Sequence, residues 1–98
     1  MSRDLTIKTI IEAVAVLREI SLRGGATAID LQDSLNLSRD KTFRLLATLK
    51  KEEMVEDLGD GKYGLGEEMA RLWAAFRSRL SLEMDERQKI LIETEVEE

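Results

Sequence analysis

The chain has 98 residues, enough for one small domain, and 43% of them are hydrophobic while 36% are charged. It contains no histidine and no cysteine, which removes the commonest general base, the thiol nucleophile and the usual zinc ligands. We therefore expect neither an enzyme nor a metal or cofactor site. No apolar run approaches the roughly 20 residues of a membrane span. Together with the missing cysteines and the lack of a signal-peptide pattern, this predicts a cytoplasmic protein without membrane contact.

The net charge of −5 is unevenly distributed along the chain. Residues 1–82 carry 13 basic and 13 acidic side chains, whereas residues 83–98 carry two basic and seven acidic ones. Residues 92–98 are predicted to be an acidic, solvated tail. Electrostatic screening acts over about 8 Å at physiological salt, so such a tail does not prevent a distant surface from binding an acidic partner.

Residues 5–23 have the spacing of a first helix. Five apolar side chains recur at helical intervals and predict its inward face: Ile7, Ile10, Ile11, Val14 and Leu17. Val16 and Ile20, together with Ala13, widen the apolar surface beyond that stripe. Two interpretations follow: the helix is well buried in its own core, or its second side meets another protomer.

A second, shorter helix is predicted after the Gly24–Gly25 pair, since glycine commonly ends a helix. Thr27 is expected to cap it, with Asp30 completing a capping box. Its inward residues would be Ala28, Leu31 and Leu35. Asn36 tolerates the left-handed conformation that a tight turn to the next helix requires.

Residues 38–51 predict a third helix with one apolar and one basic face. Ser38 is a good N-cap, and the inward positions are Thr42, Leu45, Leu46 and Leu49. The segment holds five basic residues and one acidic residue. A short positive helix with a thin apolar seam is typical of a DNA recognition helix, and with the preceding helix it predicts a helix-turn-helix.

Residues 54–58 and 62–65 are predicted strands around Gly59-Asp60-Gly61, which supplies the backbone angles of a hairpin turn. Three helices followed by a β-hairpin describe a winged helix-turn-helix. The predicted fold is thus mainly α with a small β-hairpin: a three-helix core, a wing and a C-terminal linker-like helix. The predicted divisions are a DNA-binding domain at 1–66, a helix for dimerisation at 67–91 and the tail at 92–98.

The fourth helix, predicted to run from Glu67 to about Ile90, repeats large apolar side chains beyond the length that a winged-helix core covers. A stripe that outlasts its own domain needs another surface, and a twofold partner is its commonest source. We therefore expect a homodimer held by the first and fourth helices. The predicted dimer contacts are Val16, Ile20, Trp73, Phe76, Leu80 and Met84.

Nine residues are predicted to contact double-stranded DNA: Thr27, Ser38, Arg39, Asp40, Lys41, Phe43, Arg44, Lys51 and Lys62. Several have alternatives. Arg44 either contacts a phosphate or guanine or pairs with a carboxylate of the wing or second helix. Asp40 either stabilises the helix dipole or accepts from cytosine. Phe43 either contacts a thymine methyl or covers the core edge against the hairpin.

The remaining candidates also carry two interpretations. Arg39 and Lys41 stand at the helix start, where base edges are usually met, but charged residues there also serve solubility. Lys51 is either attracted to a phosphate or part of a solvated face. Thr27 is a cap first, and its helix start also presents amides to a phosphate. Lys62 is the sole basic residue of the wing.

Four motifs give the chain a resemblance to a known family. They are Gly25-Ala-Thr-Ala-Ile-Asp-Leu31, Leu35-Asn-Leu-Ser38, Arg44-Leu-Leu-Ala-Thr-Leu49 and Gly59-Asp-Gly-Lys-Tyr-Gly-Leu-Gly66. In order and spacing they resemble the DNA-binding domain of the IclR family of bacterial transcriptional regulators, over residues 5 to about 82. The resemblance implies a dimeric winged-helix DNA binder with its recognition helix at 38–51 and its wing at 54–65.

Members of that family usually continue into an effector-sensing domain after the fourth helix. The present sequence stops inside the corresponding linker helix, so we expect a stand-alone or excised DNA-binding domain without a small-molecule effector site. The main prediction is a sequence-specific transcriptional regulator. The alternative is a winged-helix protein-interaction module that uses its acidic tail and an acidic wing segment: Glu52, Glu53, Glu56, Asp57 and Asp60.

Overall fold

A computed structural model describes residues 3–83 of the chain. This part is mainly helical, with four helices and a small antiparallel sheet of three strands, an architecture compatible with a winged helix. Residues up to Glu68 belong to one compact unit, and a second unit begins at Met69. The predictions for Met84 and for the tail at 92–98 lie outside the described residues.

The first helix, α1 (Lys8–Arg23), begins three residues later than predicted. The Asp4 carboxylate explains the difference, because it accepts hydrogen bonds from both the backbone N–H and the hydroxyl of Thr6, at 3.0 and 2.7 Å. Such a local turn competes with helix formation. The helix ends as predicted at Gly24, whose φ of 69° is left-handed.

The inward face of α1 is not the predicted one. Val16 and Ile20 are 0% and 1% exposed and lie in the core, while four residues of the predicted inward stripe, Ile7, Ile10, Ile11 and Val14, face solvent. The fifth, Leu17, packs against the core as predicted. At about 100° per residue the two sets occupy roughly opposite sides of the helix. The assignment of Val16 and Ile20 to a dimer interface is therefore wrong, because neither has surface to offer a partner.

The second and third helices confirm their predicted ends. In α2 (Ala28–Leu35) the Thr27 hydroxyl accepts from the Asp30 N–H, and the Asp30 carboxylate accepts from the Thr27 N–H. Asn36 ends α2 in the left-handed conformation, at φ 54°. In α3 (Arg39–Lys51) the Ser38 hydroxyl accepts from the Lys41 N–H at 3.1 Å. The four buried residues of α3 are the four predicted: Thr42, Leu45, Leu46 and Leu49.

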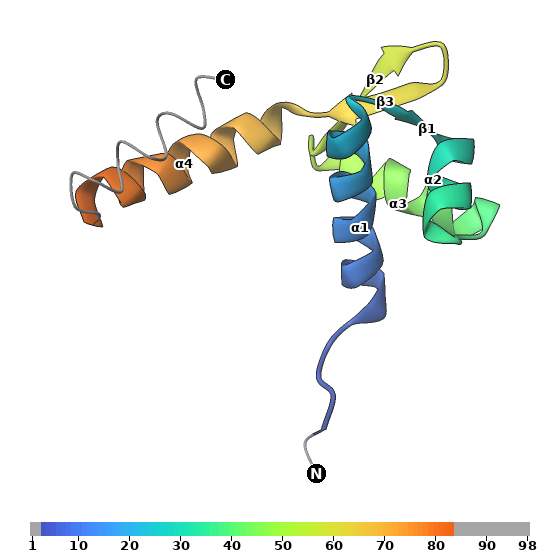
Figure 1. Ribbon diagram of the computed structural model, residues 1–98, viewed down its shortest axis with the longest axis horizontal. Coiled ribbons are helices and arrows are strands. Elements are labelled where there is room, and N and C mark those ends of the chain that lie inside the picture. Colours follow the sequence, from blue (N-terminus) through green and yellow to red (C-terminus); the bar gives the residue numbers. More distant parts are fainter. Residues whose placement is uncertain (1–2, 84–98) are drawn as a thin grey trace. The chain divides into compact units, whose positions relative to one another are not determined.

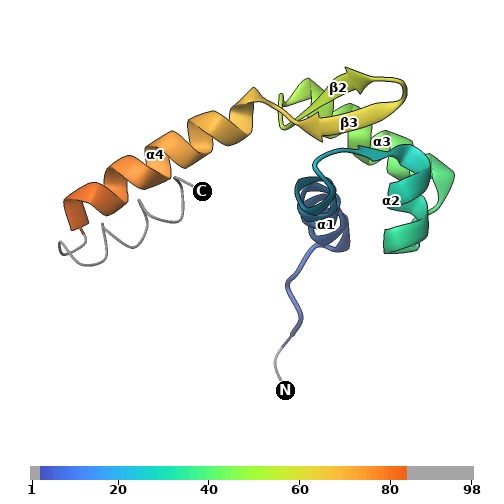
Figure 2. The same cartoon turned by 45° about the horizontal axis from the view of Figure 1, so that its top comes forward.

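The predicted hairpin forms from β2 (Val55–Gly59) and β3 (Lys62–Leu65). A further strand, β1 (Ala26–Thr27), was not predicted, because two residues are too short to show a period. It pairs antiparallel with β3, placing Thr27 opposite Lys62, so the strand order is β1-β3-β2. Figures 1 and 2 show β1 as the link between α1 and α2 that joins both to the hairpin.

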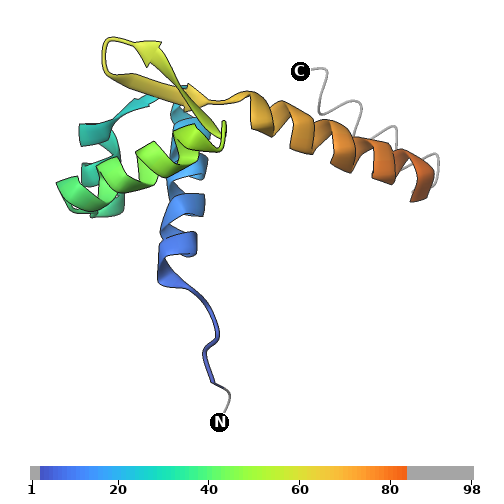
Figure 3. The same ribbon diagram turned by 180° about the vertical axis from the view of Figure 1, so that it is seen from behind.

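The core of the first unit is shared among these elements, and Figure 3 shows α3 lying across α1. Its buried apolar residues are Val16, Ile20, Ala26, Ala28, Leu31, Leu45, Leu46, Leu49 and Val55. Thr42 is the one buried polar residue of the described part, and its hydroxyl donates to the Ser38 carbonyl at 2.8 Å. The polar group is thereby satisfied, as burial requires.

The last helix, α4 (Glu67–Glu83), follows a close backbone junction. The Gly66 N–H donates to the Met54 carbonyl and the Glu68 N–H to the Glu53 carbonyl, at 2.9 and 3.0 Å. Further along α4, the large side chains Leu72, Trp73 and Phe76 are exposed. In the part of the chain that the structure describes, no helix has the length and apolar character needed to cross a membrane.

Replacing Gly66 with alanine is expected to destabilise the first unit by about 1–3 kcal/mol in urea unfolding, as overpacking does. A Cβ at this position would lie 2.3 Å from the backbone oxygen of Glu53, which cannot swing aside. Gly64→Ala is the matched control, because the three atoms nearest its Cβ all belong to the half-exposed side chain of Leu58, which can move. Equal stability of the two variants would contradict the close-junction argument.

Candidate nucleic-acid interface

The sequence predicts that one face of the third helix is exposed and basic. In the structure this is the outward face of α3, which is polar and carries several basic residues. Burial of Leu45, Leu46 and Leu49 fixes its orientation. The exposed residues of α3 outside the buried stripe, which make up this face, are Arg39, Asp40, Phe43, Arg44, Ala47, Thr48, Lys50 and Lys51. One-sided burial thus brings together five of the nine predicted DNA contacts.

Phe43 lies on this face and is 42% exposed. Part of its ring is therefore open to a partner, and both interpretations of Phe43 stay predictions. The Arg39 guanidinium carbon lies 5.2 Å from the centre of the Phe43 ring, which is cation–π distance. The two residues are one helical turn apart and form a single exposed feature.

Arg44 has neither of the protein partners considered for it. Its guanidinium lies 3.9 Å from the carboxylate of Asp40, one turn earlier on the same helix, and both side chains are strongly exposed. Exposed pairs of this kind contribute only about 0.3–0.5 kcal/mol, so Arg44 is readily drawn to another anion. Asp40 does occupy the first turn, where the helix dipole favours a carboxylate.

Lys41 differs from its neighbours because it is turned toward α1. Its Nζ lies 2.9 Å from Oε1 of Glu12, an oxygen that is fully shielded from water. The distance is that of an ion pair, although the angle is not that of a hydrogen bond. Since a shielded carboxylate oxygen needs a compensating charge, Lys41 has a structural role as the partner of Glu12, and its DNA contact stays a prediction.

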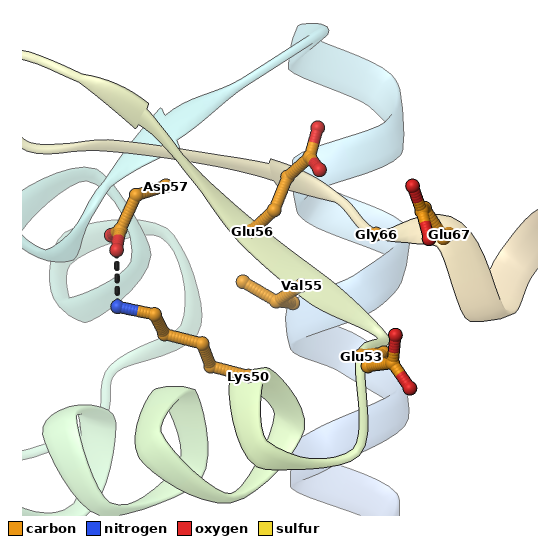
Figure 4. A pocket seen from close by; sticks show the side chains of 7 residues that line it. All are labelled: Lys50, Glu53, Val55, Glu56, Asp57, Gly66 and Glu67. Carbon is orange, nitrogen blue, oxygen red and sulfur yellow. Dashed lines mark hydrogen bonds and ion pairs between the residues drawn. The ribbon is translucent and has the colours of Figure 1, made fainter.

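Lys50 is likewise paired, with the Asp57 carboxylate on β2 (Figure 4). This contact raises the pKa of Lys50, because the carboxylate stabilises the charged ammonium. Two of the five basic residues in 38–51 therefore bind other elements. The outward charge of α3 comes from Arg39, Arg44 and Lys51.

Thr27 and Lys62 lie opposite each other on β1 and β3. The Thr27 hydroxyl is engaged in the capping box, and the hydrogen bonds from Thr27 hold the pKa of Asp30 below the ordinary range. Lys62 is exposed and close enough to Asp30 to contribute to the same shift. The basic wing residue thus adjoins the start of α2, and a carboxylate stands near it.

An acidic depression borders the hairpin at the C-terminal end of α3 (Figure 4). Its lining residues are Lys50, Glu53, Val55, Glu56, Asp57, Gly66 and Glu67. Four carboxylates against one ammonium make this a surface that repels phosphate. Among residues 3–83, no group of three or more acidic side chains is arranged to hold a metal ion.

The start of α1 also borders the outward face of α3, an arrangement that no sequence motif predicts. Thr9 lines a shallow depression together with Lys41, Arg44, Leu45 and Thr48. Thr9 belongs to no motif and is far from α3 in sequence, so only the packing of α1 across α3 reveals it. Its hydroxyl adds a hydrogen-bonding group beside Arg44.

The different roles of Lys41 and Lys51 are testable by exchanging each for glutamine, which has similar helix propensity. Lys41→Gln should lower the free energy of unfolding by about 1 kcal/mol, because it leaves the Glu12 carboxylate uncompensated. Lys51→Gln should leave stability within about 0.5 kcal/mol of the original. Urea titrations measure both.

The double variant Glu12→Gln, Lys41→Gln provides the control, since it removes both charges. It should be more stable than Lys41→Gln alone. If Lys41→Gln is as stable as the original chain, the ion pair has no structural role.

No family model matches the chain, and no curated protein matches it either. The interface consists of a half-buried helix, an Arg–Phe cation–π contact, two further exposed cations and an acidic edge.

Proposed function

We propose that this chain is a sequence-specific DNA-binding transcriptional regulator of the winged helix-turn-helix type, working in the cytoplasm. The observation that carries the proposal is the outward face of α3, where Arg39, Arg44 and Lys51 are exposed together with Phe43. The major groove admits an α-helix, and arginine and apolar side chains are suited to its base edges. The motifs that resemble the IclR family support the same proposal.

Within this proposal, α3 enters the major groove and other groups position it. Lys51 and Lys62 attract phosphates, while the Ser38 hydroxyl, an acceptor in its cap, still has its own proton to donate. Lys41 stabilises α3 through Glu12 and so acts indirectly. Each protomer then neutralises about three or four phosphates.

We further propose that the protein binds as a homodimer. Ile7, Ile10, Ile11 and Val14 form an exposed apolar stripe on α1, and Leu72, Trp73 and Phe76 form another on α4. Apolar patches on two elements of so small a chain favour association. A second copy of this chain is the partner that also fits DNA binding. Its recognition helix would let the dimer read two half-sites about one helical turn apart, or a multiple of it.

The second candidate is a protein-interaction module, and the acidic depression at the hairpin favours it. Glu56 and Asp57 border that depression, and Asp60 lies at the hairpin turn. A Lys-rich peptide is the partner whose charge such a surface complements.

Selection of duplexes from a random pool by the full chain is expected to enrich one sequence. Affinity for that duplex should fall with salt at a log–log slope of about −5 to −7, as for a dimer that neutralises about six to eight phosphates. Lys51→Gln should flatten the slope by about 1 for each phosphate that the Lys51 ammonium neutralises. An unenriched pool and a flat salt response would reject DNA binding.

The second candidate has its own control. Glu56→Gln with Asp60→Asn should leave the affinity for the selected duplex unchanged or raised. If the same variant instead loses binding to a Lys-rich peptide, and the original chain selects no DNA, the interaction-module function is the correct one.

Sedimentation equilibrium at micromolar concentration should give the mass of two chains. Ile10→Glu or Phe76→Glu should shift it toward one chain, because each places a charge in an apolar stripe. Ile29→Glu and Leu82→Glu are matched controls at exposed positions outside those stripes and should leave the mass unchanged. If the original protein has the mass of a single chain, the homodimer proposal is wrong.

A further inference from the structure

The Arg39–Phe43 pair has a geometry that an isolated surface arginine lacks. The guanidinium carbon lies 5.2 Å from the ring centre, and both residues are exposed on the outward face of α3. At this distance the face of the ring attracts the guanidinium electrostatically. Such a contact makes no conventional hydrogen bond to the ring, so the five N–H donors of the guanidinium stay available to other acceptors.

The cation–π contact also restricts how Arg39 moves. A guanidinium held near a ring loses less side-chain entropy when it binds, because its orientation is already partly fixed. Arg44 is more mobile: its partner is the Asp40 carboxylate at 3.9 Å, and so weak an exposed pair does not fix the orientation of the guanidinium. Of the two arginines, Arg39 is therefore the one prepared to bond a planar pair of acceptors.

The other exposed cations are less suited to this task. Lys41 is bound to Glu12 and Lys50 to Asp57, while Lys51 stands at the last turn of α3. Arg39 and Phe43 occupy its first two turns, and recognition helices usually meet base edges with their N-terminal residues.

We propose that Arg39 and Phe43 read two neighbouring base pairs as one unit in the major groove. The guanidinium bonds N7 and O6 of a guanine, and the exposed ring contacts the C5 methyl of an adjacent thymine. Neighbouring base pairs lie about 3.4 Å apart along the DNA axis, so side chains whose charged and aromatic centres are 5.2 Å apart can reach adjacent base pairs. The inference rests on the proposed DNA-binding function and adds the base step that it recognises.

The test uses the original protein and chemically altered DNA, so no variant has to fold. The probe is the duplex that the full chain selects from a random pool. Each thymine is replaced in turn by deoxyuridine, which lacks the methyl, and each guanine by 7-deazaguanine, which lacks N7. Replacement of one particular thymine should lower affinity about fourfold. Replacement of the guanine beside it should lower affinity about five- to 100-fold.

Protein variants then assign each effect to its residue. Phe43→Ala should abolish the response to deoxyuridine at that one thymine, and Arg39→Ala the response to 7-deazaguanine at its neighbour, because neither alanine can make the contact. Lys51→Gln is the matched control: it should weaken binding to every duplex while keeping both responses. Far-UV circular dichroism and urea unfolding verify that the variants fold.

The outcomes separate this inference from the function on which it rests. If the chain selects a duplex but neither analogue changes affinity, or the two sensitive positions are not adjacent, the paired reading is wrong and DNA binding stands. Responses that persist in the Phe43 and Arg39 variants also reject it. If no duplex is selected at all, the proposed function fails and the paired reading with it.

Discussion

Burial of one side of α3 is the constraint on which the rest of the first unit depends. Leu45, Leu46 and Leu49 join residues from α1, α2 and the sheet in a single small core. Because a helix of this length buries only one stripe, the opposite stripe must face solvent. The core therefore determines which residues α3 displays, and the caps at Ser38 and Asn36 determine where that display begins.

The basic residues of α3 fall into two groups, those paired with carboxylates of other elements and those exposed on the surface. Lys41 and Lys50 are paired with carboxylates of α1 and β2, so their charges hold α3 against its neighbours. Arg39, Arg44 and Lys51 are left on the outward face. A count of basic residues in the sequence overstates the charge that this face presents, because the partners that neutralise part of it come from other segments of the chain.

Local signals in the sequence predicted the local structure well. The capping box at Thr27, the left-handed Asn36 and the buried stripe of α3 depend on residues within one or two turns, and all were confirmed. The inward face of α1 was wrong, because that helix has two apolar sides and only tertiary packing selects between them. Strand β1 and the Glu12–Lys41 pair depend on long-range contacts, which a single sequence does not display.

The acidic edge gives the proposed interface a direction. The Lys50–Asp57 pair fixes the C-terminal end of α3 beside a depression with four carboxylates, whereas Arg39 and Phe43 lie at the other end. Phosphate is disfavoured beside the depression, while Arg39 at the other end and Lys51 on the exposed side of the last turn attract it. If α3 meets DNA, this gradient favours an approach through its N-terminal half and disfavours insertion of the hairpin, since like charges set close together are costly. A domain with nearly equal numbers of positive and negative side chains can in this way still bind an anion in one orientation, because the two kinds of charge lie on different parts of its surface.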